Sequence, residues 1–309
     1  FLRALTNGAR GGNVLVCYGS SSSGGGGGDS GRGGGGGSEC SEAVGTSGGS
    51  GGGGDDGEPY FKFIMLNPSV HFADILREAR AVVLVGGTMR PVAPLVKQLF
   101  PDTPRDRLEL FSCGHVVPPE NLLPLCVARG PSGVQFDFTF RQRATDIQIA
   151  ELGRLLNNVC TVVPGGVVVF LASYGYLEEV LKRWKASGQL AQLNARKKVF
   201  CEPRAARDVD RVLADYSVGG GGGWGPLKKG GALLLSVVGA KMSEGINFAD
   251  DMARCVVMVG LPYPDSRDPE LRQRMAYLDR ATGAGAGREY YQSICMRAVN
   301  QSIGRSIRH

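Results

Sequence analysis

Two arginines and a glutamine near the end of the sequence have the spacing of a phosphate-binding helix face. Gln301, Gly304, Arg305 and Arg308 form the pattern Q-x-x-G-R-x-x-R. On a helix, Gln301, Arg305 and Arg308 share one face because they recur at steps of four and three residues, and Gly304 leaves room for a close ligand. Two guanidinium groups suit a multiply charged phosphate, since each offers a planar fork of donors and stays charged. The alternative is a solvated basic helix end.

Hydroxyl groups follow two apolar runs elsewhere in the sequence. Ser173 and Tyr174 come after VVVFLA, and Thr88 comes after AVVLVGG. Hydroxyls and free backbone N–H groups at the start of a helix suit a nucleic-acid phosphate, and Lys241 after a third apolar run would add a cation. The alternative is structural: Ser173 caps the helix, Tyr174 packs, and the Thr88 hydroxyl bonds its own backbone in a turn.

Four short apolar runs would position these groups. They cover residues 81–85, 166–171, 232–238 and 255–260, and each is rich in β-branched residues without polar alternation. Such runs are typical of strands buried on both faces of a parallel sheet. Stretches with helical spacing lie between them, at residues 70–80, 147–159, 174–184, 206–216, 269–278 and 289–302. Strands alternating with helices predict an α/β fold with a doubly wound parallel sheet, whose ligands bind beyond the carboxyl ends of the strands.

The composition limits how much of the chain can form a core. The 309 residues allow one large or two ordinary domains, and 48 of them are glycine. Much of the glycine lies at residues 19–57 and 219–223, where too little apolar surface is available to offset the entropy of ordering, so disorder is expected there. The net charge of +6 is compatible with a polyanionic partner without requiring one.

The cysteines and histidines do not have the spacing of a metal site. None of the eight cysteines forms a C-x-x-C pair, so we expect no zinc or iron–sulfur site within this sequence. His71 and His115 have no partners at metal spacing and are interpreted as structural. Free thiols fit a reducing compartment. No apolar run approaches the ~20 residues that span a bilayer, so we expect no membrane partner.

The motifs and their order resemble those of superfamily-two DNA helicases of the XPD-like, iron–sulfur type, and within that group the ChlR type. Q-x-x-G-R-x-x-R resembles motif VI of these enzymes, and SEGINF at residues 243–248 resembles their motif V, usually S-E-G-I-D-F. VVVFLASY resembles motif IV, and the run that ends in GGTM resembles motif III. LNPSVHF, FSCGHVVPP and VVPGGVVVF add to the likeness.

The resemblance implies a RecA-like fold and an ATP-dependent DNA helicase. It implies that Arg305 and Arg308 are catalytic, facing the γ-phosphate of ATP. It assigns ATP binding to Gln301, Gly304, Glu244, Gly245 and Asn247, and DNA binding to Ser173, Tyr174, Thr88 and Lys241. Asn247 replaces the usual Asp, which leaves any role for a carboxylate there in doubt. ATP and Mg²⁺ would be shared with a first motor domain, and the 4Fe–4S cluster would lie upstream.

The same resemblance predicts the domain organisation and the cellular setting. Residues 1–59 would be a disordered Gly/Ser-rich segment, residues 60–104 the last helix and strand of motor domain 1, and residues 105–309 a motor domain 2 truncated at its C-terminus. The sequence contains neither G-x-x-x-x-G-K-[ST] nor a D-E-A-H-type box, so we expect a fragment that is inactive alone. Single-stranded or forked DNA, the nucleus, and DNA repair or sister chromatid cohesion are implied.

Two other functions fit parts of the sequence. One is a catalytically inert nucleic-acid-binding module that keeps the helicase fold, although such a module would not need both arginines. The other is an unrelated Rossmann-like nucleotide-binding protein, which is disfavoured because no G-x-G-x-x-G follows an early strand. A P-loop, a D-E-A-H-type box and four clustered cysteines upstream would favour the helicase.

Overall fold

The computed structural model describes most of the chain outside the glycine-rich segments. The described residues are 12–17, 60–87, 89–114, 117–220, 231–242, 248 and 250–304. Their strands are β1 (Gly12–Cys17), β2 (Tyr60–Met65), β3 (Val167–Leu171), β4 (Lys198–Cys201), β5 (Ala232–Val237) and β6 (Cys255–Met258). Their helices are α2 (Ser69–Glu78), α3 (Val92–Leu99), α4 (Asp146–Val162), α5 (Tyr174–Ala186), α6 (Gln189–Arg196), α7 (Val209–Gly220), α9 (Pro269–Thr282) and α10 (Ala286–Ile303). Short 3₁₀ turns lie at Arg105–Arg107, Pro119–Asn121, Ala206–Asp208 and Asp250–Met252.

A parallel sheet forms the centre of the larger part of the molecule. Within the described residues its strand order is β4-β5-β3-β6, and all three pairings are parallel. The runs at 166–171, 232–238 and 255–260 therefore form β3, β5 and β6 as predicted. Strand β4, which the sequence did not predict, extends the sheet beyond β5.

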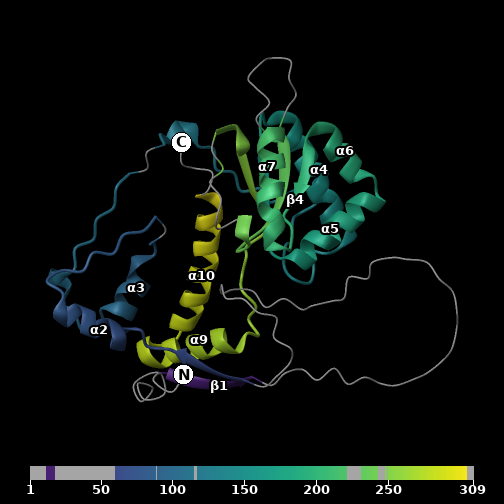
Figure 1. Ribbon diagram of the computed structural model, residues 1–309. Coiled ribbons are helices and arrows are strands. Elements are labelled where there is room, and N and C mark those ends of the chain that lie inside the picture. The colour runs from purple at the N-terminus through teal and green to yellow at the C-terminus, as the bar shows by residue number, and fades with distance from the viewer. Residues whose placement is uncertain are drawn as a thin grey trace, which may run out of the picture.

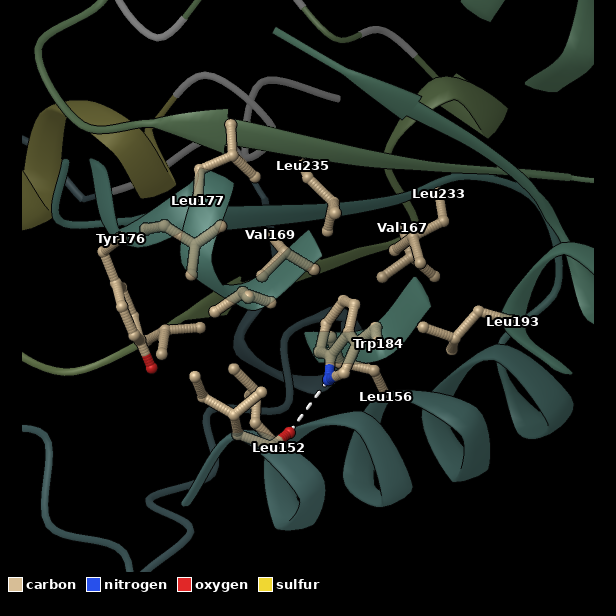
Figure 2. Packing of buried hydrophobic residues seen from close by; sticks show 14 of the residues in the cluster. Leu152, Leu156, Val167, Val169, Tyr176, Leu177, Trp184, Leu193, Leu233 and Leu235 are labelled. Atoms are coloured by element: carbon tan, nitrogen blue, oxygen red, sulfur yellow. Dashed lines mark hydrogen bonds between the residues drawn. The ribbon is translucent and has the colours of Figure 1, made fainter. Parts of the chain in front are cut away.

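Helices cover both faces of this sheet, which confirms the doubly wound α/β fold. Successive residues of β3 point to opposite faces, so Val167 and Val169 pack with α4, α5 and α6 while Phe170 packs with Tyr216 of α7. Figure 2 shows the Trp184 indole in the first of these cores, between the strands and α4. Its Nε1 donates to the carbonyl oxygen of Ile149 at 2.9 Å, which fastens α5 to α4.

The other helices and a hairpin lie beside this domain. In Figure 1, α2 and α3 lie on one side of the long helix α10 and the sheet with its helices lies on the other. Strands β1 and β2 pair antiparallel, from Gly12 opposite Met65 to Cys17 opposite Tyr60. The hairpin contacts α9 through Asn13 Nδ2, which donates to Gln273 Oε1 at 3.1 Å, and through an ion pair of 2.7 Å between Lys62 and Glu270.

Two predictions about the first hundred residues are wrong in part. Residues 12–17, expected within a disordered segment, form β1 because GNVLVC is apolar and pairs with YFKFIM; the rest of residues 1–59 lies outside the described residues. Residues 81–85 are not a strand, and Val83 and Val85 are 80% and 91% exposed. A buried strand needs neighbours to pair with, and no described strand lies alongside this run. The helix expected at 70–80 is confirmed as α2.

Candidate functional site

The carboxyl ends of the parallel strands bring several polar groups to one edge of the sheet. Ser173 follows β3, Glu202 follows β4, and Lys241 follows β5. The amide of Val238 donates to Leu171 O at 3.0 Å, which keeps the segments after β5 and β3 adjacent where the strands end. In open α/β sheets, ligands bind at this edge.

Ser173 is the N-cap of α5. Its Oγ accepts a hydrogen bond from the amide of Tyr176 at 3.2 Å. The capping alternative left open by the sequence is therefore confirmed, and a phosphate contact stays a prediction alongside it. The first turn of any helix carries N–H groups without intrahelical acceptors and the positive end of the helix dipole. This end of α5 can therefore favour an anion.

Tyr174 packs at the same edge. Its hydroxyl donates to Pro203 O at 3.5 Å, and the Arg204 guanidinium lies 5.3 Å from its ring centre. Burial raises the pKa of Tyr174 to about 12, and the negative charge of Glu202 adds to that shift. The phenol thus stays neutral at physiological pH, and the packing alternative is confirmed.

Glu202 is a functional candidate that the sequence analysis missed. Its side chain is buried and accepts three hydrogen bonds: from Ser236 Oγ at 2.5 Å, from the Val237 amide at 2.9 Å and from the Met242 amide at 2.8 Å. Burial raises the pKa of Glu202 above its ordinary value, although these hydrogen bonds oppose the shift. The only sequence signal was a carboxylate directly after the unpredicted strand KVFC.

Arg143 is a second missed residue, close to the first turn of α5. Its guanidinium lies 5.1 Å from the ring centres of both Phe140 and Tyr176. Burial lowers the pKa of Arg143, yet the group stays charged, as arginine does in proteins. In the part of the chain that the structure describes, it forms no ion pair. Arg143 therefore adds a positive charge near the first turn of α5, whereas Arg204 is paired with Glu178 at 2.7 Å.

The remaining predicted site residues fall into two groups. Gln301 is exposed in the last turn of α10, and Gly304 ends that helix, with its amide donating to Asn300 O at 2.8 Å. Lys241 is exposed. The predicted positions outside the described residues are Thr88, Glu244, Gly245, Asn247, Arg305 and Arg308. The structure therefore brings Ser173 and Tyr174 to the carboxyl edge of the sheet, next to the segment that carries Lys241. The catalytic role of Arg305 and Arg308 stays a prediction.

Neither a metal cluster nor a membrane span is found in the described part of the chain. No three His, Cys, Asp or Glu side chains among those residues lie close enough together to hold a metal ion. Of the helices within them, none is long and apolar enough to cross a bilayer. His71 is exposed on α2, and His115 lies outside the described residues.

Comparison with known proteins gives a consistent set of relatives. Residues 156–309 match the helicase C-terminal domain family. ATP-dependent DNA helicase DDX11 of Danio rerio is 50% identical over 262 residues, which cover 80% of this chain and 29% of that protein. ATP-dependent DNA helicase CHL1 of Candida albicans is 40% identical over 263 residues, covering 82% of this chain and 30% of that protein. The chain thus spans about three tenths of these relatives' length.

A solved structure shows a weaker likeness. The structure of S. tokodaii Xpd4 matches with a TM-score of 0.38 and 22% identity, over 56% of this chain and 30% of that one.

Proposed function

Because the chain belongs to the ChlR-type group of XPD-like helicases and carries their helicase C-terminal domain at residues 156–309, we propose that it forms the C-terminal half of an ATP-driven motor that moves along single-stranded DNA. The observation that carries this proposal is the match of residues 156–309, which contain Q-x-x-G-R-x-x-R, to the helicase C-terminal domain family.

The proposed part in hydrolysis belongs to the end of α10 and the residues that follow it. Arg305 and Arg308 would face the γ-phosphate and neutralise the charge that develops during phosphoryl transfer, an effect worth ~10³–10⁵ in rate for an arginine finger. The exposed Gln301 and the helix end at Gly304 support this assignment, because Gln301 lies four residues before Arg305 and Gly304 directly precedes it. The nucleotide contacts of motif V would come from Glu244, Gly245 and Asn247.

ATP and Mg²⁺ would be shared with a first motor domain that supplies the P-loop and the acidic box. Residues 60–104 would be the end of that domain and residues 105–309 the second one. Within this chain, the residues that would meet the nucleotide offer guanidinium, amide and backbone groups, and the carboxylate of Glu244. A 4Fe–4S cluster would depend on cysteines outside this sequence, because those within it lack the spacing.

The proposed DNA track crosses the carboxyl edge of the sheet. A motor must move along any sequence, and phosphates are the part of DNA that does not vary. The α5 N-terminus offers the Ser173 hydroxyl and the backbone N–H of Tyr174 as neutral donors, since the Tyr174 hydroxyl donates to Pro203 O. The exposed Lys241 on the adjacent segment offers a cation. Thr88 would add a contact from motor domain 1. The proposed substrate is single-stranded or forked DNA. The proposed location is the nucleus, and the proposed role is in DNA repair or sister chromatid cohesion.

Replacing either motif VI arginine in the full-length protein tests the proposal. Arg305→Ala or Arg308→Ala should lower kcat for DNA-stimulated ATP hydrolysis at least about a hundredfold, while nucleotide affinity changes far less, since a finger acts mostly on transition-state charge. Lysine should restore activity only in part, because a point charge cannot reproduce the planar fork. Phosphate release and fluorescent-nucleotide binding would be measured side by side.

Arg288→Ala is the matched control for these variants. Arg288 is exposed near the start of the same helix, 13 residues before Gln301, or about 20 Å at 1.5 Å per residue. The control variant should keep normal kcat. Near-normal kcat in Arg305→Ala or Arg308→Ala would instead reject the catalytic assignment of these arginines. An unmodified full-length protein without DNA-stimulated ATP hydrolysis would favour an inert nucleic-acid-binding module.

A further inference from the structure

The buried carboxylate of Glu202 connects both sides of the turn that follows β5. Oε2 accepts from Ser236 Oγ and from the Val237 amide, which lie at the end of the strand. Oε1 accepts from the Met242 amide, which lies beyond the turn. The Glu202 amide donates to Leu235 O at 2.9 Å, so the backbone that carries the carboxylate is itself fixed to β5.

Among the residues that the structure describes, the carboxylate has no counter-ion to stabilise it. Glu202 is 4% exposed and forms no ion pair with any residue that the structure describes. A buried charge of this kind is costly unless hydrogen bonds satisfy it. The three donors to the carboxylate, one hydroxyl and two backbone amides, come from β5 and the segment just after it. The charge and the conformation of the turn therefore stabilise each other.

We propose that Glu202 is a positioning residue, which fixes the turn at residues 238–242 and so holds Lys241 at the DNA-facing edge of the sheet. The proposal rests on the proposed function, because it assigns Lys241 to the DNA track. Lys241 is exposed and directly precedes Met242, whose amide the carboxylate binds. Any displacement of Met242 therefore also displaces Lys241, because one peptide bond joins the two residues.

The chemistry of a carboxylate, as distinct from an amide, fits this role. Two equivalent acceptor oxygens can hold the strand side and the far side of the turn at once. Glutamine has the same shape but only one acceptor oxygen, so its NH₂ group must face one of the two sets of donors. Glu202→Gln should therefore release one side of the turn with little change in packed volume.

Amide hydrogen exchange on the 309-residue chain tests whether Glu202 fixes the turn at residues 238–242, and it does so without a measurement of function. In Glu202→Gln, exchange at Val237 or Met242 should accelerate about tenfold or more, since hydrogen bonds to charged groups are among the stronger ones. Glu202→Ala should accelerate both amides. Glu178→Gln is the control, because Glu178 is an exposed carboxylate of α5 that pairs with Arg204; both amides should keep their protection there. Unchanged exchange in Glu202→Gln would overturn the proposal.

A double-mutant cycle in the full-length protein tests the link to Lys241. Binding of a fluorescent oligothymidylate would be titrated with salt for Glu202→Gln, Lys241→Ala and the double variant. Lys241→Ala should flatten the log–log salt slope by about 0.7, the share of one phosphate on a single strand. Glu202→Gln should weaken binding in the same direction, and the double variant should bind no more weakly than Lys241→Ala alone.

The outcomes separate the two proposals. Faster exchange together with non-additive binding losses supports both. Faster exchange in Glu202→Gln with full affinity in Lys241→Ala rejects the DNA contact and, with it, the role given to Glu202. Faster exchange with additive binding losses rejects the positioning role alone, because Glu202 would then act independently of Lys241 while the DNA track stands.

Discussion

Ser173 combines a confirmed structural role with a predicted binding role, and one substitution can separate the two. Aspartate is as good an N-cap as serine, so Ser173→Asp should keep the hydrogen bond now made to the Tyr176 amide and leave the melting temperature nearly unchanged. A negative charge beside a DNA phosphate is repulsive, so single-stranded DNA affinity of the full-length protein should fall about tenfold or more at low salt. A salt titration of binding to several unrelated sequences measures it.

Ser187→Asp provides the control for this change in charge. Ser187 is exposed at the other end of α5. Ser187→Asp therefore changes the net charge by the same amount as Ser173→Asp, but away from the carboxyl edge of the sheet. DNA affinity should be close to that of the unmodified protein. If Ser173→Asp also binds normally, the residue only caps its helix and the DNA path runs elsewhere.

The residue scale also shows what kind of site residue a sequence reveals. Ser173 could be predicted because a hydroxyl stood between an apolar run and an amphipathic stretch. Glu202 and Arg143 could not, because their partners are distant in sequence: Glu202 binds the amide of Met242, and Arg143 lies against the Tyr176 ring. The sequence alone does not distinguish a buried carboxylate from an exposed one, because the difference lies in neighbours that only the fold brings together.

At the scale of elements, buried strands were predicted well where pairing partners exist. The runs that became β3, β5 and β6 lie side by side. Strand β4 was missed because KVFC is short, begins with a lysine and pairs with β5 alone among the described strands. The run at 81–85 has the composition of β3, yet it is exposed and unpaired among the described strands. Composition gives strand propensity, but hydrogen-bonding neighbours determine whether the strand forms.

The α4–α5 contact gives a stability prediction for the domain. Trp184→Phe should lower the free energy of unfolding by about 1–3 kcal/mol, because it removes a buried hydrogen bond to Ile149 O and leaves a small cavity among Leu152, Leu156 and Leu193. Figure 2 shows these side chains around the indole. Urea unfolding followed by far-ultraviolet circular dichroism measures the change.

Val162→Ala serves as the comparison for that variant. Val162 is 80% exposed at the end of α4, so its truncation should change the free energy of unfolding by no more than about 0.5 kcal/mol. Equal stability of Trp184→Phe and the unmodified chain would mean that α5 does not depend on this contact for its position.

At the scale of the whole molecule, the sheet domain and the N-terminal hairpin are linked through α9. The ion pair between Lys62 and Glu270 and the hydrogen bond between Asn13 and Gln273 join segments more than 200 residues apart. This link could not be predicted from the sequence, because each contact depends on two side chains that are distant along the chain. The helices α9 and α10 themselves were predictable from their periodicity.

The whole chain also leads to a prediction about activity. The P-loop and the Mg²⁺-binding carboxylates supply most of the contacts that hold a nucleotide in motors of this kind, and the 309 residues contain neither motif. The purified chain should therefore release no phosphate from ATP above background, with or without single-stranded DNA.

The same chain carrying both Arg305→Ala and Arg308→Ala sets that background, since it removes the predicted finger and leaves the rest unchanged. Circular dichroism with cooperative urea unfolding would establish that both samples are folded. DNA-stimulated phosphate release by the folded chain, above that of the double variant, would mean that these residues form a complete nucleotide site without a P-loop, and the assignment of this chain as half of a motor would have to be abandoned.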